Sequence, residues 1–200
     1  MLLYMYMKKY IVEGLGAFTL TLAVALSLAG QFPVSTPILA ALTLGLFVYS
    51  IGHISGAHIN PAVTIGAWSI KKIDARDAFS YIVAQFIGAG IALFVVSRTV
   101  EMPMVTASNT WMVSFAEFLG TFFFTFGIAS VIYGKTPRDI AGVVIGGSLL
   151  LGISLAALLG SNGVLNPAVA FGIGSLNIAY ALSPLVGSIL GMKVYSYVAH

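Results

Sequence analysis

Apolar stretches of two lengths set the main constraint on how this chain can fold. Six of them are about 20 residues long, the length that a helix needs to cross the roughly 30 Å hydrocarbon core of a bilayer. They cover approximately residues 10–30, 37–56, 79–100, 111–133, 139–160 and 178–198. Two others, 61–71 and 167–176, are too short to cross, and each opens at an Asn-Pro pair. Backbone enters a membrane without crossing it only where protein buries it or where it lines a water-filled cavity. The pattern predicts an all-α membrane protein with six transmembrane helices and two re-entrant half-helices beside a pore.

Charge supports this class and orients the chain. Only 8% of the residues are charged, against roughly 25% in soluble domains, so lipid is the natural solvent. With six spans, most basic residues fall on one side: Lys8, Lys9, Lys71, Lys72, Arg76, Lys135, Arg138 and, at the end of the last span, Lys193. The positive-inside rule predicts that this side and both termini are cytoplasmic, in a multi-pass protein of the cell membrane. The small net charge of +3 needs no nucleic-acid partner, and the absence of cysteine excludes disulfides and thiolate metal sites. We expect no metal and no cofactor.

The two halves of the chain repeat each other. The segment that begins at Glu13 (Glu-Gly-Leu-Gly-Ala-Phe) matches the one at Glu117 (Glu-Phe-Leu-Gly-Thr-Phe), 104 residues later, and the two Asn-Pro-Ala boxes are 106 residues apart. Each half holds three spans, so the second half must enter the membrane in the opposite orientation. Inverted repeats of this kind place the functional site near the midplane, between the repeats. We predict a single channel domain, 1–200, with repeats at about 1–104 and 105–200.

The Asn-Pro-Ala boxes have the chemistry of helix starts. Asparagine is a favoured N-cap, and proline is favoured at the first helical position. Inverted topology would bring the two starts together near the membrane centre, where their partial positive charges oppose a cation or hydrated proton. The asparagine amides would donate hydrogen bonds to a passing neutral oxygen. The predicted midplane residues are Asn60, Pro61, Ala62, Asn166, Pro167 and Ala168.

The segment 52–64 (Gly-His-Ile-Ser-Gly-Ala-His-Ile-Asn-Pro-Ala-Val-Thr) closely resembles the signature of the aquaporin, or major intrinsic protein, family. The segment 163–168 (Gly-Val-Leu-Asn-Pro-Ala) is similar to its second copy. The resemblance covers essentially the whole chain and implies a homotetramer with one pore per subunit, which conducts water and small neutral solutes. It also implies that Glu13 and Glu117, with His58, brace the re-entrant loops, and a buried carboxylate does need such donors. A proton relay or metal site with His53 and His58 is a weaker interpretation.

One position departs from the family pattern. By the resemblance an arginine follows the second box and forms part of a narrow outer filter, whereas this chain has Val169 followed by Ala170, and the loop near 100–110 is short. Counting back from the boxes gives the expected filter residues, which are Ala40, Ser154, Gly163 and Val169. None is large or charged, so we expect a wide, mildly polar filter that passes small polyols or urea as well as water. Arg98, at the outer end of the third span, is a candidate substitute for the missing arginine.

Two other functions remain open at this stage. The missing arginine allows an ion- or proton-leaky channel, although no ring of intramembrane charges is visible. A structural membrane protein with a closed pore is also possible, with aromatic side chains as the plug. The candidate plugs are Phe47, Tyr49, Phe171 and the run 122–124. An enzyme is not expected, because the chain has no Ser-His-Asp set, phosphate loop or metal cluster.

Overall fold

The computed structural model describes residues 2–30, 33–101 and 108–199, with side chains from Met7 onward. This part of the chain is helical, and six helices are long and apolar enough to cross a membrane. They are α1 (Leu2–Ala29), α2 (Thr36–Ser55), α4 (Ala75–Thr99), α5 (Trp111–Ile132), α6 (Ala141–Leu158) and α8 (Ile178–Val198). A short 3₁₀ helix, η1 (Arg138–Ile140), directly precedes α6. The predicted fold class is therefore confirmed. The first helix differs from its predicted range, because it begins well before residue 10.

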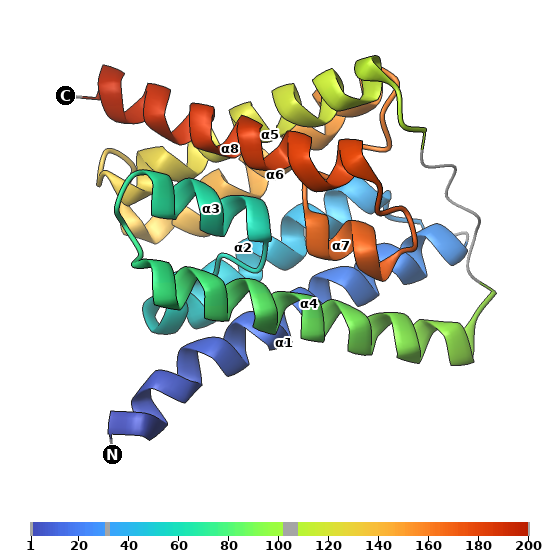
Figure 1. Cartoon of the computed structure of the whole chain (residues 1–200), viewed down its shortest axis with the longest axis horizontal. Coiled ribbons are helices and arrows are strands. Elements are labelled where there is room, and N and C mark those ends of the chain that lie inside the picture. The colour runs from blue at the N-terminus through green and yellow to red at the C-terminus, as the bar shows by residue number, and fades with distance from the viewer. Residues whose placement is uncertain (1, 31–32, 102–107, 200) are drawn as a thin grey trace.

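Two short helices lie among the long ones. Helices α3 (Pro61–Ser69) and α7 (Pro167–Gly172) each begin at the proline of an Asn-Pro-Ala box. The preceding asparagine caps each of them, since Asn60 Oδ1 accepts the Ala62 N–H at 2.8 Å and Asn166 Oδ1 accepts the Ala168 N–H at 3.1 Å. Figure 1 shows α3 and α7 between α4 and α8, with the start of α1 and the end of α8 at the same end of the molecule.

Helix packing follows the same scheme in both halves. Helix α1 packs against α2 and α4, as α5 packs against α6 and α8. Helix α3 lies on α8 of the other half, and α7 lies on α4. Helices α2 and α6 join the halves directly. Each contact in one half therefore has a counterpart in the other, as an inverted repeat requires. The predicted boundary between the repeats, at 104–105, lies outside the described residues.

Glycines allow two of these contacts to be close. A Cβ added at Gly88 of α4 would lie 2.0 Å from the Gly14 carbonyl oxygen of α1. In the second half, a Cβ at Gly187 of α8 would lie 2.3 Å from the Phe118 carbonyl oxygen of α5. Small residues at helix crossings are the usual means by which membrane helices approach backbone to backbone. Large apolar side chains cover the outside instead, including Leu42, Leu46, Phe79, Val143 and Leu158.

Candidate functional site

The two box asparagines tie the half-helices together. Asn60 Nδ2 donates to the Leu165 carbonyl at 3.0 Å, and Asn166 Nδ2 donates to the Ile59 carbonyl at 3.1 Å. Each amide therefore binds the residue that precedes the opposite box, while its oxygen caps its own helix. An amide nitrogen carries two hydrogens, so one N–H of each asparagine remains for the cavity that both side chains line. The two helix starts, with their partial positive charges, meet at this point.

The first loop is held by the carboxylate of Glu13, a fully buried residue of α1. Its Oε1 accepts the His58 N–H at 2.9 Å and the Ser55 hydroxyl at 2.6 Å, while Oε2 accepts the Ile59 N–H at 2.6 Å. Ile59 has φ of 40°, a conformation that strains a β-branched residue. Charge-assisted hydrogen bonds to its backbone offset that strain and satisfy the buried charge. We call this arrangement the first cradle.

The second loop has the same arrangement around Glu117 of α5, which is also fully buried. Glu117 Oε1 accepts the Val164 N–H at 2.9 Å, and Oε2 accepts the Leu165 N–H at 2.7 Å. The Ser161 hydroxyl donates to Oε1. Leu165 again has a positive φ, of 54°. We call this arrangement the second cradle. The structure thus brings both predicted glutamates to the loops that carry the boxes.

The first cradle includes polar groups that the sequence analysis missed. Gln85 of α4 is fully buried and donates from Nε2 to Glu13 Oε2 at 2.7 Å and to Thr64 Oγ1 at 3.1 Å. The His58 Nδ1 lies 3.1 Å from the same threonine hydroxyl. One available signal was Gln85 itself, because a polar side chain in the middle of an apolar span needs partners inside the protein. The hydroxyls of Ser55 and Ser161 gave no comparable signal.

Two cavities lie on either side of the boxes, and we name them outer and inner after the orientation that the charge pattern predicts. The outer cavity has a volume of about 290 Å³ and is lined by both asparagines and by mostly apolar side chains. The inner cavity is larger, about 1030 Å³, and its wall combines apolar side chains with polar and charged ones that include Lys9, His53 and Lys72. Leu44 and His58 line both cavities, so the two approach each other beside the first box. The arrangement places one cavity on each side of the boxes and, among the described residues, charged side chains along the wall of the inner one alone.

Three of the four predicted filter residues line the outer cavity. Ala40, Gly163 and Val169 line the outer cavity, and Ile153 lines it in place of Ser154. Ile153 faces the second loop, because a Cβ added at Gly163 would lie 3.1 Å from its Cγ2 atom. The Ser154 hydroxyl instead bonds the Leu150 carbonyl within α6. Ile153 therefore borders this cavity beside the position where the count back from Asn166 predicts Ser154.

Neither Arg98 nor most of the proposed plugs reaches the outer cavity. The Arg98 guanidinium lies 5.1 Å from the ring centre of Phe94, which is 60% exposed on the outside of α4. Phe171 makes an edge contact with Phe86. Two other candidate plugs do line a cavity: Tyr49 lines the inner one and Phe124 the outer one. Each ring forms part of the wall of its cavity and does not fill the space.

Six membrane-crossing helices, two half-helices that meet at paired asparagines and a cavity on each side define a multi-pass membrane channel. The sequence model of the Major intrinsic protein family matches residues 5–197. The chain belongs to this family.

Individual proteins agree with the assignment. The chain is 34% identical to "Aquaporin AqpM" of Methanothermobacter thermautotrophicus, over 75% of this chain and 70% of that protein. It is 34% identical to "Glycerol uptake facilitator protein-like 6" of Lactiplantibacillus plantarum, over 92% and 94% of the two chains. The fold is similar to that of the aquaglyceroporin from Plasmodium falciparum, with a TM-score of 0.72, 21% identity and 97% of both chains covered. The chain is thus a passive channel for water and small solutes, not an enzyme.

Proposed function

We propose that the channel conducts water and small neutral solutes and excludes ions and protons at the asparagine pair. The observation that carries this proposal is the reciprocal bonding of Asn60 and Asn166 across the two helix starts. A passing oxygen would accept hydrogen bonds from the remaining amide N–H groups. A cation would instead meet the positive ends of two helix dipoles without a compensating anion.

The outer filter is proposed to consist of Ala40, Ile153, Gly163 and Val169, and to be uncharged and wide enough for solutes larger than water. All four line the outer cavity. Their side chains replace none of the hydrogen bonds that an ion or a polar solute loses on leaving water, so an ion pays its full desolvation cost there. Hydrogen bonding in this region is left to the asparagine amides and the loop backbone.

Flux measurements in proteoliposomes test this proposal. Stopped-flow shrinkage would compare water with glycerol and urea gradients, and a pH-sensitive dye with a potassium gradient would detect ion leak. We expect passage of water and of at least one larger neutral solute, without ion flux. Passage of water alone would contradict the wide filter. Ion or proton flux would support the leaky-channel alternative, and absence of all flux would support the closed-pore alternative.

A pair of neighbouring variants tests the filter assignment in the same assay. Ile153→Ala removes apolar bulk from the cavity wall and should raise glycerol flux relative to water flux. Ser154→Ala alters the next residue, whose hydroxyl bonds its own helix, and should leave the flux ratio unchanged. The reverse result would restore Ser154 as the filter residue.

We further propose that the channel is a homotetramer in the cell membrane, with one pore per subunit and both chain ends in the cytoplasm. The basic side chains that line the inner cavity and the common end of α1 and α8 support this orientation (Figure 1). Because the chain has no cysteine, single-cysteine labelling is a clean test. A membrane-impermeant maleimide applied to intact cells should label Glu101→Cys and not Lys135→Cys, and cross-linking of purified protein should stop at four chains.

A further inference from the structure

A hollow of about 400 Å³ lies between the ends of α3, α5 and α8 and shares no lining residue with either channel cavity. Two lysines line it, Lys71 after α3 and Lys193 in α8. Hydroxyl groups complete its polar wall, from Ser69, Tyr133, Ser196 and Tyr197. We call it the α3–α8 hollow. No part of the proposed solute path uses these residues.

The hollow has an excess of positive charge. No carboxylate lines it among the described residues, and the ion pair found in that part of the chain joins Lys9 to Asp77 instead. The adjoining hollow shares Lys71 and adds Lys72 together with a single carboxylate, Asp74. Three ammonium groups therefore face one carboxylate across the two hollows. An anion is the ligand that this distribution favours.

One hydroxyl of the hollow, that of Ser196, has a hydrogen to donate to such an anion. The Tyr133 hydroxyl donates to Ser196 Oγ at 2.7 Å. Ser196 is the acceptor in that bond, so its own hydrogen remains for an oxygen outside the protein. An ammonium group and a hydroxyl donor side by side match the oxygens of a phosphate.

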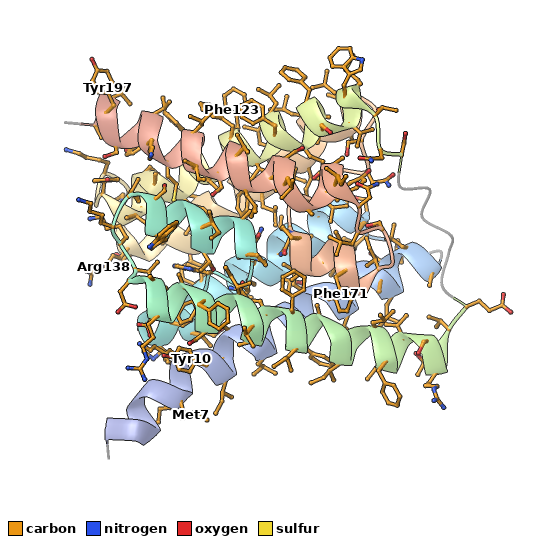
Figure 2. The ribbon with its side chains drawn as sticks, viewed as in Figure 1. Met7, Tyr10, Phe123, Arg138, Phe171 and Tyr197 are labelled. Carbon is orange, nitrogen blue, oxygen red and sulfur yellow. The ribbon has the colours of Figure 1, made fainter. Side chains whose placement is uncertain are left out.

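The position of the hollow indicates that the phosphate belongs to a lipid. It lies at the ends of membrane-crossing helices. Tyr197, which lines it, is 85% exposed, and Trp68, which lines the adjoining hollow beside Lys71, is 48% exposed. Tryptophan and tyrosine concentrate at the depth of lipid headgroups. Figure 2 shows Tyr197 projecting from the end of α8, at the end of the molecule that also carries Arg138. One and two turns before this end of α8, the exposed Val194 and Leu190 offer an apolar surface for an acyl chain.

Among the residues that the structure describes, the opposite end of the molecule has no equivalent group. There the described basic side chain at the end of α4, Arg98, lies over the ring of Phe94 on its own helix. The helix packing repeats in the two halves, but the lysine pair does not. The charge in the α3–α8 hollow is therefore a property of one end only.

We propose that the α3–α8 hollow binds the headgroup phosphate of an anionic phospholipid in the leaflet at this end of the channel. Basic pockets between membrane helices on the cytoplasmic side are suited to such headgroups. Binding here would hold α3 against α8 from outside the solute path. The proposal does not depend on which solutes the channel conducts.

Tryptophan fluorescence provides the test, because the chain has two tryptophans. The variant Trp111→Phe leaves Trp68, beside Lys71, as the single reporter. Purified protein would be reconstituted in phosphatidylcholine vesicles with increasing fractions of brominated phosphatidylglycerol or brominated phosphatidylcholine. We expect the anionic lipid to quench Trp68 at a lower mole fraction. In Lys71→Gln and in Lys193→Gln, the affinity for the anionic lipid relative to phosphatidylcholine should fall about fivefold. This factor corresponds to the loss of about 1 kcal/mol for one interfacial charge.

The matched control is Lys135→Gln, an exposed lysine near the same end that does not line the hollow. It should keep the preference for the anionic lipid. Equal quenching by the two lipids, or an equal loss in the control, would overturn the proposal. Reversal of the quenching by millimolar inorganic phosphate would overturn the lipid assignment in favour of a free anion. Retained water flux in each variant shows that a lost preference is not a loss of the fold.

Discussion

The two cradles hold their loops by the same bonds but have different surroundings. In each, a buried glutamate accepts a serine hydroxyl and two successive backbone N–H groups. The first cradle adds a fourth donor, the Gln85 amide, which is itself bonded to Thr64. No side chain of α8 makes the corresponding bond among those described for the second cradle.

The sequence shows what stands in the place of Gln85. Tyr81 and Tyr180 occupy matching positions 99 residues apart, since each tyrosine hydroxyl bonds the start of its loop. The same offset pairs Gln85 with Pro184, which has no side-chain donor. The bonds common to both cradles are those that fix the boxes. The polar additions belong to the half whose loop faces the polar inner cavity, so the repeat preserves the geometry while each half adapts to its own mouth.

The largest expected loss of stability comes from replacing the glutamate of one cradle at a time with glutamine. Glu117→Gln turns an amide nitrogen toward donors such as the Leu165 N–H, whose described acceptor is Glu117 itself, at about 1–3 kcal/mol for each unsatisfied group. Glu13→Gln should cost less, because the buried Gln85 Oε1 has no partner and can accept from the new amide after rotation. Thermal unfolding in detergent would compare the two, with the exposed Glu101→Gln as the control. An equal or larger loss for Glu13→Gln would remove the proposed difference between the cradles.

A smaller effect is expected from charge beside each box. Val63 and Val169 directly follow the boxes, and they line the inner and outer cavities respectively. Val169→Arg should lower glycerol flux more than water flux, and an added barrier of about 1.4 kcal/mol would give a tenfold loss. Val63→Arg faces the larger cavity and should leave the flux ratio unchanged. If Val169→Arg lowers both fluxes equally, the outer cavity does not sort solutes.

The smallest expected effect tests the donor that only the first cradle has. Gln85→Leu removes its bonds to Glu13 and Thr64, while Glu13 keeps three other donors. We expect a loss of about 0.5–1.5 kcal/mol, the net value of a typical hydrogen bond. Pro184→Ala, at the matching place in α8, should change stability less. Equal effects in the thermal unfolding assay would show that Gln85 fills space without contributing through its amide.

Prediction from the sequence succeeded where the signal was local or repeated. Length and hydropathy gave the six long helices, and the Asn-Pro pairs gave the starts of α3 and α7. The resemblance to the family implied that Glu13 and Glu117 bind the loops, and the structure has both carboxylates bonded there. The network of Gln85, Thr64 and His58 was not predicted, because it joins α4, α3 and a loop that are distant in sequence. The crossed bonds of the two asparagines likewise depend on the packing of one half against the other.

The sequence by itself determined the membrane class, the number of spans and the repeat. The class and the spans follow from the total hydropathy of stretches of about 20 residues, and the repeat follows from the spacing of motifs along the chain. None of these depends on how a helix is rotated about its axis. Only the tertiary structure decided which side chains line the cavities, since that does depend on rotation. Each residue turns an α-helix by about 100°, so an error of one position moves a side chain from the cavity wall to a neighbouring face. Ile153 and Ser154 are such a case: the apolar side chain of Ile153 lines the outer cavity, whereas the sequence predicted the hydroxyl of Ser154 there.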